Sequence, residues 1–228
     1  MAVMERKGQT PRQTPSQKPR KVTPATVEAV FTRLCGEYKD TRTELTYESP
    51  FQLLIAVILS AQCTDARVNV TTPALFAAYP TAEKMAAASP KAIERLIHSC
   101  GFYRQKAKSL ISAATDLVER YAGEVPQTLE ALTTLRGVGR KTASVVLNQA
   151  FGLPAIAVDT HVARVSNRLG WAHSQSAEKI EQELKDLIPM GDWATVNGLL
   201  ILHGRRFCKA RKPDCRQCVV RDHCPSAT

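Results

Sequence analysis

The stretch Leu135–Gly152, LRGVGRKTASVVLNQAFG, joins two apolar helical patterns through a Gly-Val-Gly turn. The preceding residues, TLEALTTL, repeat apolar side chains at helical spacing, and RKTASVVLNQAF resumes that repeat after Gly137 and Gly139. Glycine lets the backbone turn with positive φ and approach a ligand closely. The N–H groups at the start of the second helix could therefore hold a phosphate, with Lys141 beside it. From the turn alone, an ordinary corner between two packed helices is an equally possible interpretation.

The same helical spacing continues through most of the chain. Three pairs, Thr23-Pro24, Ser49-Pro50 and Ser89-Pro90, each place a capping side chain and a first-turn proline before an apolar run. From these starts and the later periodic runs we predict helices at 24–37, 50–62, 90–100, 104–121, 128–135, 140–151, 159–169, 176–188 and 192–204. Only PAIAV, at 154–158, reads as extended, and it is too short to imply a sheet. The expected fold class is all-α.

The composition limits the classes of partner. The 228 residues are 44% hydrophobic and 23% charged, which is enough to bury a core. The formal net charge of +10 favours a polyanion, with nucleic acid ahead of an anionic membrane surface. The longest apolar run, Phe51–Ala61, is too short to cross a bilayer, which takes about 20 residues. The polar, proline-rich start shows no secretory signal. We therefore expect a cytoplasmic protein, associated with the nucleoid if bacterial, that has no membrane partner.

Residues 1–22, MAVMERKGQTPRQTPSQKPRKV, lack any apolar period and are rich in Gln, Pro and Thr. We predict a disordered basic tail. Its six Lys and Arg residues against a single Glu supply half of the formal charge excess of the chain. A solvating tail and a DNA-tethering arm both fit this composition.

A second polar signal, AVDTHVARVSNRLG, places Asp159 at a helix start that Gly170 closes. Such an aspartate is an N-cap, whose carboxylate accepts the N–H of His161 or Val162. A capped carboxylate is also fixed in direction and is favoured as the anion by the helix dipole. It could stabilise positive charge that grows on a sugar as a base departs. The residues leave open whether Asp159 only caps the helix or also takes part in catalysis.

Four of the seven cysteines crowd the last stretch, CKARKPDCRQCVVRDHC, as Cys208, Cys215, Cys218 and Cys224. In an intracellular protein such a cluster indicates metal binding rather than disulfides. Four thiolates bind either zinc or an iron–sulfur cluster. Structural zinc usually takes two close pairs of ligands, and here only Cys215 and Cys218 form one. The residues alone leave both metals open.

Taken together, LRGVGRKTASVVLNQAFG and AIAVDTHVARVSNRLG resemble the helix–hairpin–helix and the catalytic aspartate segment of the DNA glycosylase superfamily. The similarity runs from about Thr23 to the end of the cysteine segment. Within the superfamily it is closest to endonuclease III, a family of bifunctional DNA glycosylases and abasic-site lyases. The resemblance implies that Lys141 and Asp159 are catalytic. One departure is clear, because the family usually has proline where this chain has Arg136.

The resemblance implies a definite chemistry. An unprotonated Lys141 would attack C1′ of the damaged nucleotide, expel the base and leave a Schiff base, after which β-elimination cuts the strand. Cover by the bound DNA and the N-terminal end of the helix would both favour loss of the lysine proton. The expected enzyme is a monomer of base excision repair that removes oxidised pyrimidines. Its expected partner is duplex DNA containing a damaged base or an abasic site.

The resemblance also assigns the DNA contacts and the cofactor. Gln62, in LSAQCTDARVN, would fill the space left by the extruded base, and Phe102, in CGFYRQKA, would press into the opposite strand. The hairpin would contact the DNA backbone through Arg136, Gly137, Gly139 and Arg140. The 4Fe–4S cluster of the family would be held by Cys208, Cys215, Cys218 and Cys224.

The family pattern further implies two helical lobes that flank a DNA-binding cleft. One would be a six-helix domain at 43–153 that contains the helix–hairpin–helix. The other would be an iron–sulfur cluster domain made of 24–42 and 154–228. Asp159 would then face Lys141 across the cleft.

Two other readings stay open. A non-enzymatic iron–sulfur DNA-binding redox sensor would need the cysteines and the basic surface, but neither Lys141 nor Asp159. A glycosylase of related specificity is the second alternative. Adenine-specific relatives usually lack the lysine, and oxoguanine-type relatives usually lack the cluster, so the combination of both favours the endonuclease III family.

Overall fold

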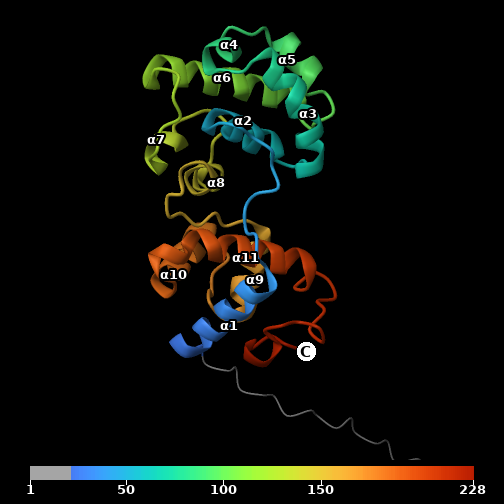
Figure 1. Ribbon diagram of the computed structural model, residues 1–228, viewed down its shortest axis with the longest axis vertical. Coiled ribbons are helices and arrows are strands. Elements are labelled where there is room, and N and C mark those ends of the chain that lie inside the picture. The colour runs from blue at the N-terminus through green and yellow to red at the C-terminus, as the bar shows by residue number, and fades with distance from the viewer. Residues whose placement is uncertain (1–21) are drawn as a thin grey trace, which may run out of the picture.

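The computed structural model describes residues 22–228 and confirms the all-α fold (Figure 1). The described chain forms α-helices and short 3-10 helices, with no strand among them. Apart from Val22, the predicted basic tail lies outside the described residues. None of the helices within 22–228 is both long enough and apolar enough to span a bilayer.

The helices follow one another along the chain with short connections. Their bounds are α1 (Pro24–Glu37), α2 (Pro50–Ser60), α3 (Asp65–Ala78), α4 (Ala82–Ala86), α5 (Pro90–Leu96), α6 (Tyr103–Tyr121), α7 (Leu129–Thr133), α8 (Arg140–Phe151), α9 (Thr160–Leu169), α10 (Ala177–Leu187) and α11 (Trp193–Arg206). The 3-10 helices are η1 (Met190–Asp192) and η2 (Arg221–His223).

The helix starts confirm the predicted capping signals. Thr23, Ser49 and Ser89 each accept a hydrogen bond from the backbone N–H three residues later, and a proline follows each of them. The side-chain oxygen provides an acceptor for an N–H group that has no partner within the helix. Helices α1, α2 and α5 therefore begin where the sequence predicts. Helix α5 nevertheless ends at Leu96 rather than near Cys100.

Helices α3 and α4 are absent from the sequence prediction. Two of the buried positions of α3 are threonines, Thr71 and Thr72, which interrupt its apolar period. Pro73 lies inside the helix, where proline normally signals a break. Helix α4 has only five residues, so no period can show in it. With these two, seven helices, α2–α8, fall within 43–153, where we expected six.

Helices α3–α8 pack around α2, and the seven helices α2–α8 together form what we call the hairpin lobe. Phe51 and every residue from 53 to 59 are buried, and α2 contacts α3, α6 and α8. Burying one Leu or Ile side chain contributes about 1.5–3 kcal/mol, so α2 is the main apolar support of this lobe. Figure 1 shows α2 between α6 on one side and α8 on the other.

Helix α1 packs with the C-terminal helices in a second core, which we call the terminal lobe. Val27, Val30 and Leu34 of α1 belong to one buried cluster with Trp171, Val220 and residues of α9–α11. Figure 1 shows α1 beside α9 and α11, at the opposite end of the molecule from α4 and α6. The first helix therefore folds with the last part of the chain, and the hairpin lobe is inserted between them.

Two connections, 38–49 and 152–159, cross between the lobes, and both contact α11. A Cβ at Gly198 would overlap the carbonyl oxygen of Thr41, so only glycine lets the first connection pass so close to the helix. In the second connection, the N–H of Ala157 donates to Oδ1 of Asn197 at 2.8 Å. The adjacent residues Asn197 and Gly198 therefore fix both connections at the junction of the lobes.

Candidate active site

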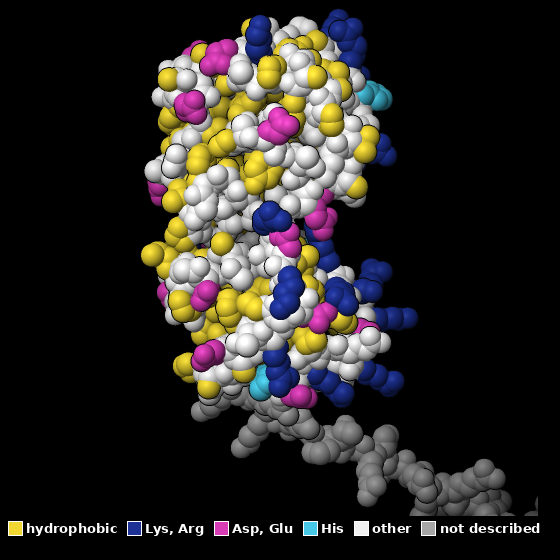
Figure 2. Space-filling model, in the orientation of Figure 1, with side chains coloured by type: hydrophobic (Ala, Val, Ile, Leu, Met, Phe, Trp, Pro, Cys, Tyr) yellow, Lys and Arg dark blue, Asp and Glu magenta, His cyan; other side chains and the backbone are white. Residues whose placement is uncertain are grey.

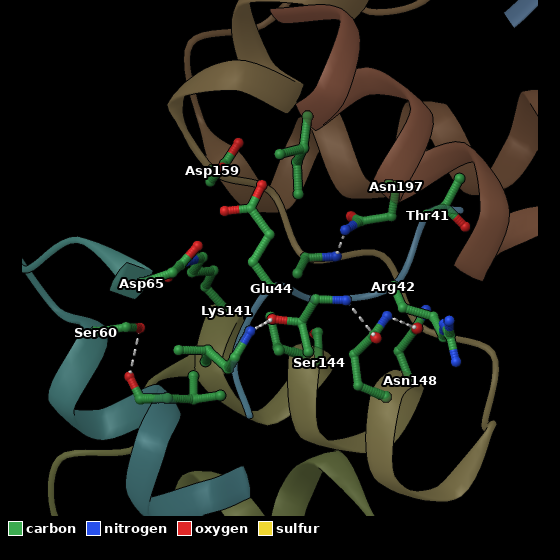
Figure 3. A pocket seen from close by; sticks show the side chains of 18 of the residues that line it. Thr41, Arg42, Glu44, Ser60, Asp65, Lys141, Ser144, Asn148, Asp159 and Asn197 are labelled. Carbon is green, nitrogen blue, oxygen red and sulfur yellow. Dashed lines mark hydrogen bonds between the residues drawn. The ribbon is translucent and has the colours of Figure 1, made fainter. Parts of the chain in front are cut away.

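A cavity of about 110 Å³ lies where the two lobes meet (Figure 3). Its walls come from the end of α2, residues 41–45, the start of α3, one face of α8, residues 155–159 and α11. Figure 2 shows the molecular surface indented between the lobes. Both Lys141 and Asp159 line this cavity, so the structure brings the two candidate catalytic residues to one site.

The turn before α8 requires glycine at its first position. Gly137 has a φ of +82°, and a Cβ there would lie 2.9 Å from the Cβ of Ser109. Val138 points inward and is buried. Gly139 is the N-cap of α8 and has no side chain to cap the helix, so the N–H groups of the first turn have no side-chain cap. The turn at Gly137 and the start of α8 after Gly139 therefore lie where the sequence predicts them.

Asp159 is the N-cap of α9, as the sequence predicts. Its Oδ1 accepts the N–H groups of both His161 and Val162 at 2.8 Å. Since both bonds use one oxygen, Oδ2 accepts no hydrogen bond from within residues 22–228. Lys141, in the first turn of α8, is exposed and lines the same cavity. No ion pair joins the two side chains in the described part of the chain. The site therefore contains an amine and a carboxylate that are not bound to each other.

Arg140, the first residue of α8, is held by the terminal lobe. Its Nε and Nη2 donate to the carboxylate of Glu181 in α10 at 2.6 and 3.0 Å, and Nζ of Lys185 lies 2.5 Å from the same carboxylate. Burial raises the pKa of Glu181, but the hydrogen bonds from Arg140 and Lys185 outweigh burial and lower the pKa below its ordinary value. Arg140, an expected DNA contact, thus forms an ion pair between the two lobes. The side chain of Arg136, the other expected basic contact of the hairpin, is exposed.

Glu44 and Asp65 of the cavity wall are absent from the sequence prediction, and Arg205, which the sequence groups with the cations near the cysteine segment, also lines this cavity. Arg205 of α11 donates to Glu44 at 2.7 Å and to Asp65 at 3.1 Å. These bonds join α11 to the start of α3 and to the connection 38–49 on one side of the cavity. Asp65 closely follows Gln62 in the sequence, but no local signal pairs it with an arginine 140 positions later.

Gln62 and Phe102 lie outside this cavity, on the loops that lead into α3 and α6. Both side chains are exposed, and Phe102 is 69% exposed, which is unusual for a large apolar residue. A Cβ on Gly101 would lie 3.7 Å from the carbonyl oxygen of Gln62, so the two loops are direct neighbours. The structure therefore places these two candidate DNA contacts together on the surface of the hairpin lobe.

A second cavity, of about 210 Å³, lies against the C-terminal segment and is lined by Cys208, Cys215, Cys218 and Cys224. Burial raises the pKa of the Cys218 and Cys224 thiols, and charge on the other cysteines of the set raises it further. Arg168 Nη1 lies 3.4 Å from Sγ of Cys208, and His203 Nε2 lies 3.4 Å from Sγ of Cys218. Within 22–228, no three His, Cys, Asp or Glu side chains meet closely enough to hold a single ion. The four cysteines thus line one shared cavity.

Comparison with known proteins connects this arrangement to DNA repair. Residues 55–190 match the family model of the HhH-GPD superfamily of base excision DNA repair proteins. Endonuclease III of Synechocystis sp. is 51% identical over 191 residues, which cover 83% of this chain and 87% of that protein. A trapped endonuclease III–DNA covalent intermediate, an estranged-adenine complex, superposes with a TM-score of 0.86 at 41% identity, covering 91% of this chain and 98% of that one. A non-covalent endonuclease III–DNA complex matches with the same TM-score and identity, over 91% of this chain and 97% of that one.

Proposed function

The chain belongs to the endonuclease III family of the HhH-GPD superfamily, and from this premise we propose that Lys141 and Asp159 carry out its chemistry. The protein is a base excision repair enzyme, a DNA glycosylase and abasic-site lyase that binds DNA. The observation that best supports the assignment of the two residues is their shared cavity. An amine from α8 and a carboxylate from the start of α9 line one space at the junction of the lobes.

In this proposal Lys141 is the nucleophile. Its Nζ forms a bond to C1′ of the damaged nucleotide, and the N-glycosidic bond breaks with its electron pair leaving on the base. The nitrogen then loses a proton and the C1′–O4′ bond opens, so that O4′ leaves as a hydroxyl group and a Schiff base forms at C1′. The Schiff base acidifies C2′, and loss of a C2′ proton expels the 3′ phosphate, so the strand is cut without hydrolysis. Only the unprotonated amine can attack. Lys141 is exposed in the free protein, where an incoming nucleotide can reach its amine.

Asp159 would stabilise the positive charge that develops on the sugar as the base leaves. The hydrogen bonds to Oδ1 fix the direction of the carboxylate, and Oδ2 stays available to the substrate. A direct ion pair with Lys141 would hold the proton that the amine has to lose. The two side chains form no ion pair with each other in the described structure, and this avoids that conflict.

We further propose that the substrates are oxidised pyrimidines and abasic sites in duplex DNA. Gln62 and Phe102 are exposed on adjacent loops, where Gln62 could occupy the space of the extruded base and Phe102 could stack in the opposite strand. The uncapped N–H groups after Gly137 and Gly139, with Arg136 beside them, suit a DNA phosphate. Because one chain supplies both Lys141 and Asp159, the site needs no second copy, and we propose a monomer.

The cysteine cavity fits the 4Fe–4S cluster that the family implies. A cavity of about 210 Å³ lined by four thiols has room for a group of several atoms, whereas one zinc ion takes its sulfur ligands at about 2.3 Å. We propose that Cys208, Cys215, Cys218 and Cys224 hold this cluster. When bound, it would crosslink a segment that has few apolar residues and so hold the basic side chains between the cysteines in place.

Borohydride trapping tests the catalytic assignment. Borohydride reduces the Schiff base and leaves the enzyme covalently attached to an abasic duplex, which a denaturing gel detects. Wild-type protein should form this adduct and Lys141→Gln should not. Lys179→Gln, which changes an exposed lysine of α10, is the matched control and should trap like wild type. An adduct of undiminished yield with Lys141→Gln would show that another amine is the nucleophile.

Metal analysis tests the cofactor assignment separately. Purified protein should be yellow-brown and contain about four iron atoms per chain. Cys218→Ser should lose the colour and most of the iron, whereas Cys35→Ser, outside the cysteine cavity, should keep both. Colourless wild-type protein that contains zinc would refute the cluster.

A further inference from the structure

The loops that carry Gln62 and Phe102 share an uncommon backbone conformation. Gln62 has a φ of +53° and Phe102 a φ of +57°, and among described residues only Ala122 and Lys212 are other non-glycine residues with positive φ. A left-handed conformation is unfavourable for a residue with a Cβ. Such a conformation persists only where the surrounding structure enforces it. Something in the hairpin lobe must therefore hold both loops.

Lys106 lies in the first turn of α6, directly after Phe102, and its side chain reaches the end of α2, directly before Gln62. The residue is only 6% exposed, and lysine is rarely buried without a partner. Its Nζ donates to the carbonyl of Leu59 at 2.8 Å, and its backbone N–H donates to the carbonyl of Phe102 at 3.0 Å. Leu59 lies in the last turn of α2, three residues before Gln62. The single residue Lys106 thus links the end of α2 to the start of α6.

The end of α2 is a favourable place for a positive charge. The last carbonyls of a helix have no partner within the helix, and they carry the negative end of its dipole. The carbonyl of Val57 accepts a hydrogen bond from Oγ of Ser60 at 2.9 Å. The carbonyl of Ser60 accepts a hydrogen bond from the N–H of Cys63 at 3.1 Å. The Leu59 carbonyl is taken by Lys106. Without the ammonium group, this carbonyl would lose that bond immediately before the left-handed turn at Gln62.

We propose that Lys106 is a positioning residue for base extrusion, which holds the two loops so that Gln62 and Phe102 enter the duplex already in their working conformation. This inference rests on the roles proposed above for Gln62 and Phe102. Extruding a base from the stack costs free energy. Loops that first had to be ordered would add the entropy of fixing their residues to that cost.

The test compares substrates that do and do not require extrusion of a paired base. Lys106→Met keeps a long apolar side chain and removes the donor. Its single-turnover rate of base removal from a duplex with one thymine glycol should fall about tenfold, the effect of ordering roughly one residue. Borohydride trapping on an abasic duplex, where no base has to be extruded, should change much less. The fluorescence of 2-aminopurine placed opposite the lesion should rise less than with wild type, because Gln62 and Phe102 would disturb the base stack less.

Two further variants complete this experiment. Lys108→Met changes an exposed lysine of the same helix and should match wild type in all three measurements. In a double-mutant cycle, Lys106→Met combined with Gln62→Ala should lose little more than the more damaging single variant, since both changes act on the same step. If Lys106→Met does not fold, Lys106→Leu, which also removes the donor and keeps an apolar side chain, replaces it in the same measurements.

The outcomes separate the inference from the proposal beneath it. If Gln62→Ala and Phe102→Ala both remove thymine glycol at the wild-type rate, the proposed roles of these two residues fail. If they are slow but Lys106→Met is not, the inference about Lys106 is wrong. The inference is also wrong if Lys106→Met lowers the rate on paired and abasic substrates equally, because that pattern indicates a general structural defect.

Discussion

At the residue scale, the carboxylate of Asp159 combines a structural task with the chemical one proposed for it. Oδ1 holds the first turn of α9, and Oδ2 accepts no hydrogen bond from the described residues. Asparagine offers the helix an equivalent oxygen but carries no charge. Alanine offers neither. The two substitutions can therefore separate capping from catalysis.

We expect Asp159→Asn to melt close to wild type, because Asn and Asp are similar N-caps, whereas Asp159→Ala should lose about 1 kcal/mol of unfolding free energy. Both variants should slow base removal by about 100-fold or more, since a charge that acts in the transition state is lost. Thermal unfolding and single-turnover kinetics measure the two effects. An active Asp159→Asn would show that the carboxylate serves the helix alone.

At the element scale, the hairpin before α8 uses its two glycines differently. Gly137 needs both positive φ and the absence of a Cβ, whereas Gly139 has nothing within 4 Å of the position where a Cβ would be. Gly137→Ala should therefore cost about 2–3 kcal/mol, from backbone strain and from contact with Ser109. Gly139→Ala should cost at most about 1 kcal/mol, through a weaker N-cap. Denaturant unfolding compares them, and equal losses would mean that Gly137 can relax.

The second element-scale feature is the ion pair that ties the hairpin to α10. The folded protein lowers the pKa of Glu181, so the stability from its bonds is present above the unfolded pKa of about 4.3. That stability is lost as the pH falls through the lower pKa of the folded state. Above this range Glu181→Gln should cost about 1–3 kcal/mol, because Arg140 and Lys185 lose their ionised partner.

The melting temperature of wild type should therefore exceed that of Glu181→Gln most clearly at neutral pH, and the difference should shrink below about pH 4. Glu178→Gln, an exposed change in the same helix, should show a small difference at every pH. A difference for Glu181→Gln that stays constant down to low pH would mean that the carboxylate is not the charged partner of Arg140.

At the scale of the whole molecule, basic side chains gather on the terminal lobe beside the C-terminal segment (Figure 2). Arg205 and Arg206 are engaged in ion pairs with carboxylates. The exposed cations that follow them are Lys209, Arg211, Lys212, Arg216 and Arg221. These five can face DNA phosphates without first breaking the ion pairs of Arg205 and Arg206.

Five phosphate contacts imply that the logarithm of the DNA association constant falls with the logarithm of salt concentration at a slope of about −4.5. The double variant Lys209→Ala with Arg211→Ala should reduce that slope by about 1.8. Lys84→Ala, on α4 at the far end of the hairpin lobe, should leave it unchanged. Fluorescence anisotropy over a salt series measures all three. An unchanged slope in the double variant would place the DNA elsewhere.

Local sequence patterns were sufficient to predict most of the helices and the chemical groups that they carry. Capping pairs such as Ser49-Pro50, the glycines of the hairpin and the N-cap at Asp159 act within a few residues, so a local pattern is sufficient to predict them. The sequence pattern did not predict α3, because threonines share its buried face and a proline lies inside it. The domain limits at 43–153 and at 24–42 with 154–228 stay predictions, as do the roles of the candidate site residues.

Only the tertiary structure decided which groups share a space. The cavity with Lys141 and Asp159 depends on two connections that pass over α11, and its wall includes an arginine that reaches carboxylates far away in sequence. The bonds from Lys106 to Leu59 and from Arg140 to Glu181 likewise join distant segments. Local propensity and periodicity depend on neighbouring residues, whereas these contacts depend on how whole helices pack. That is the physical reason why the sequence alone could name the catalytic candidates but not what surrounds them.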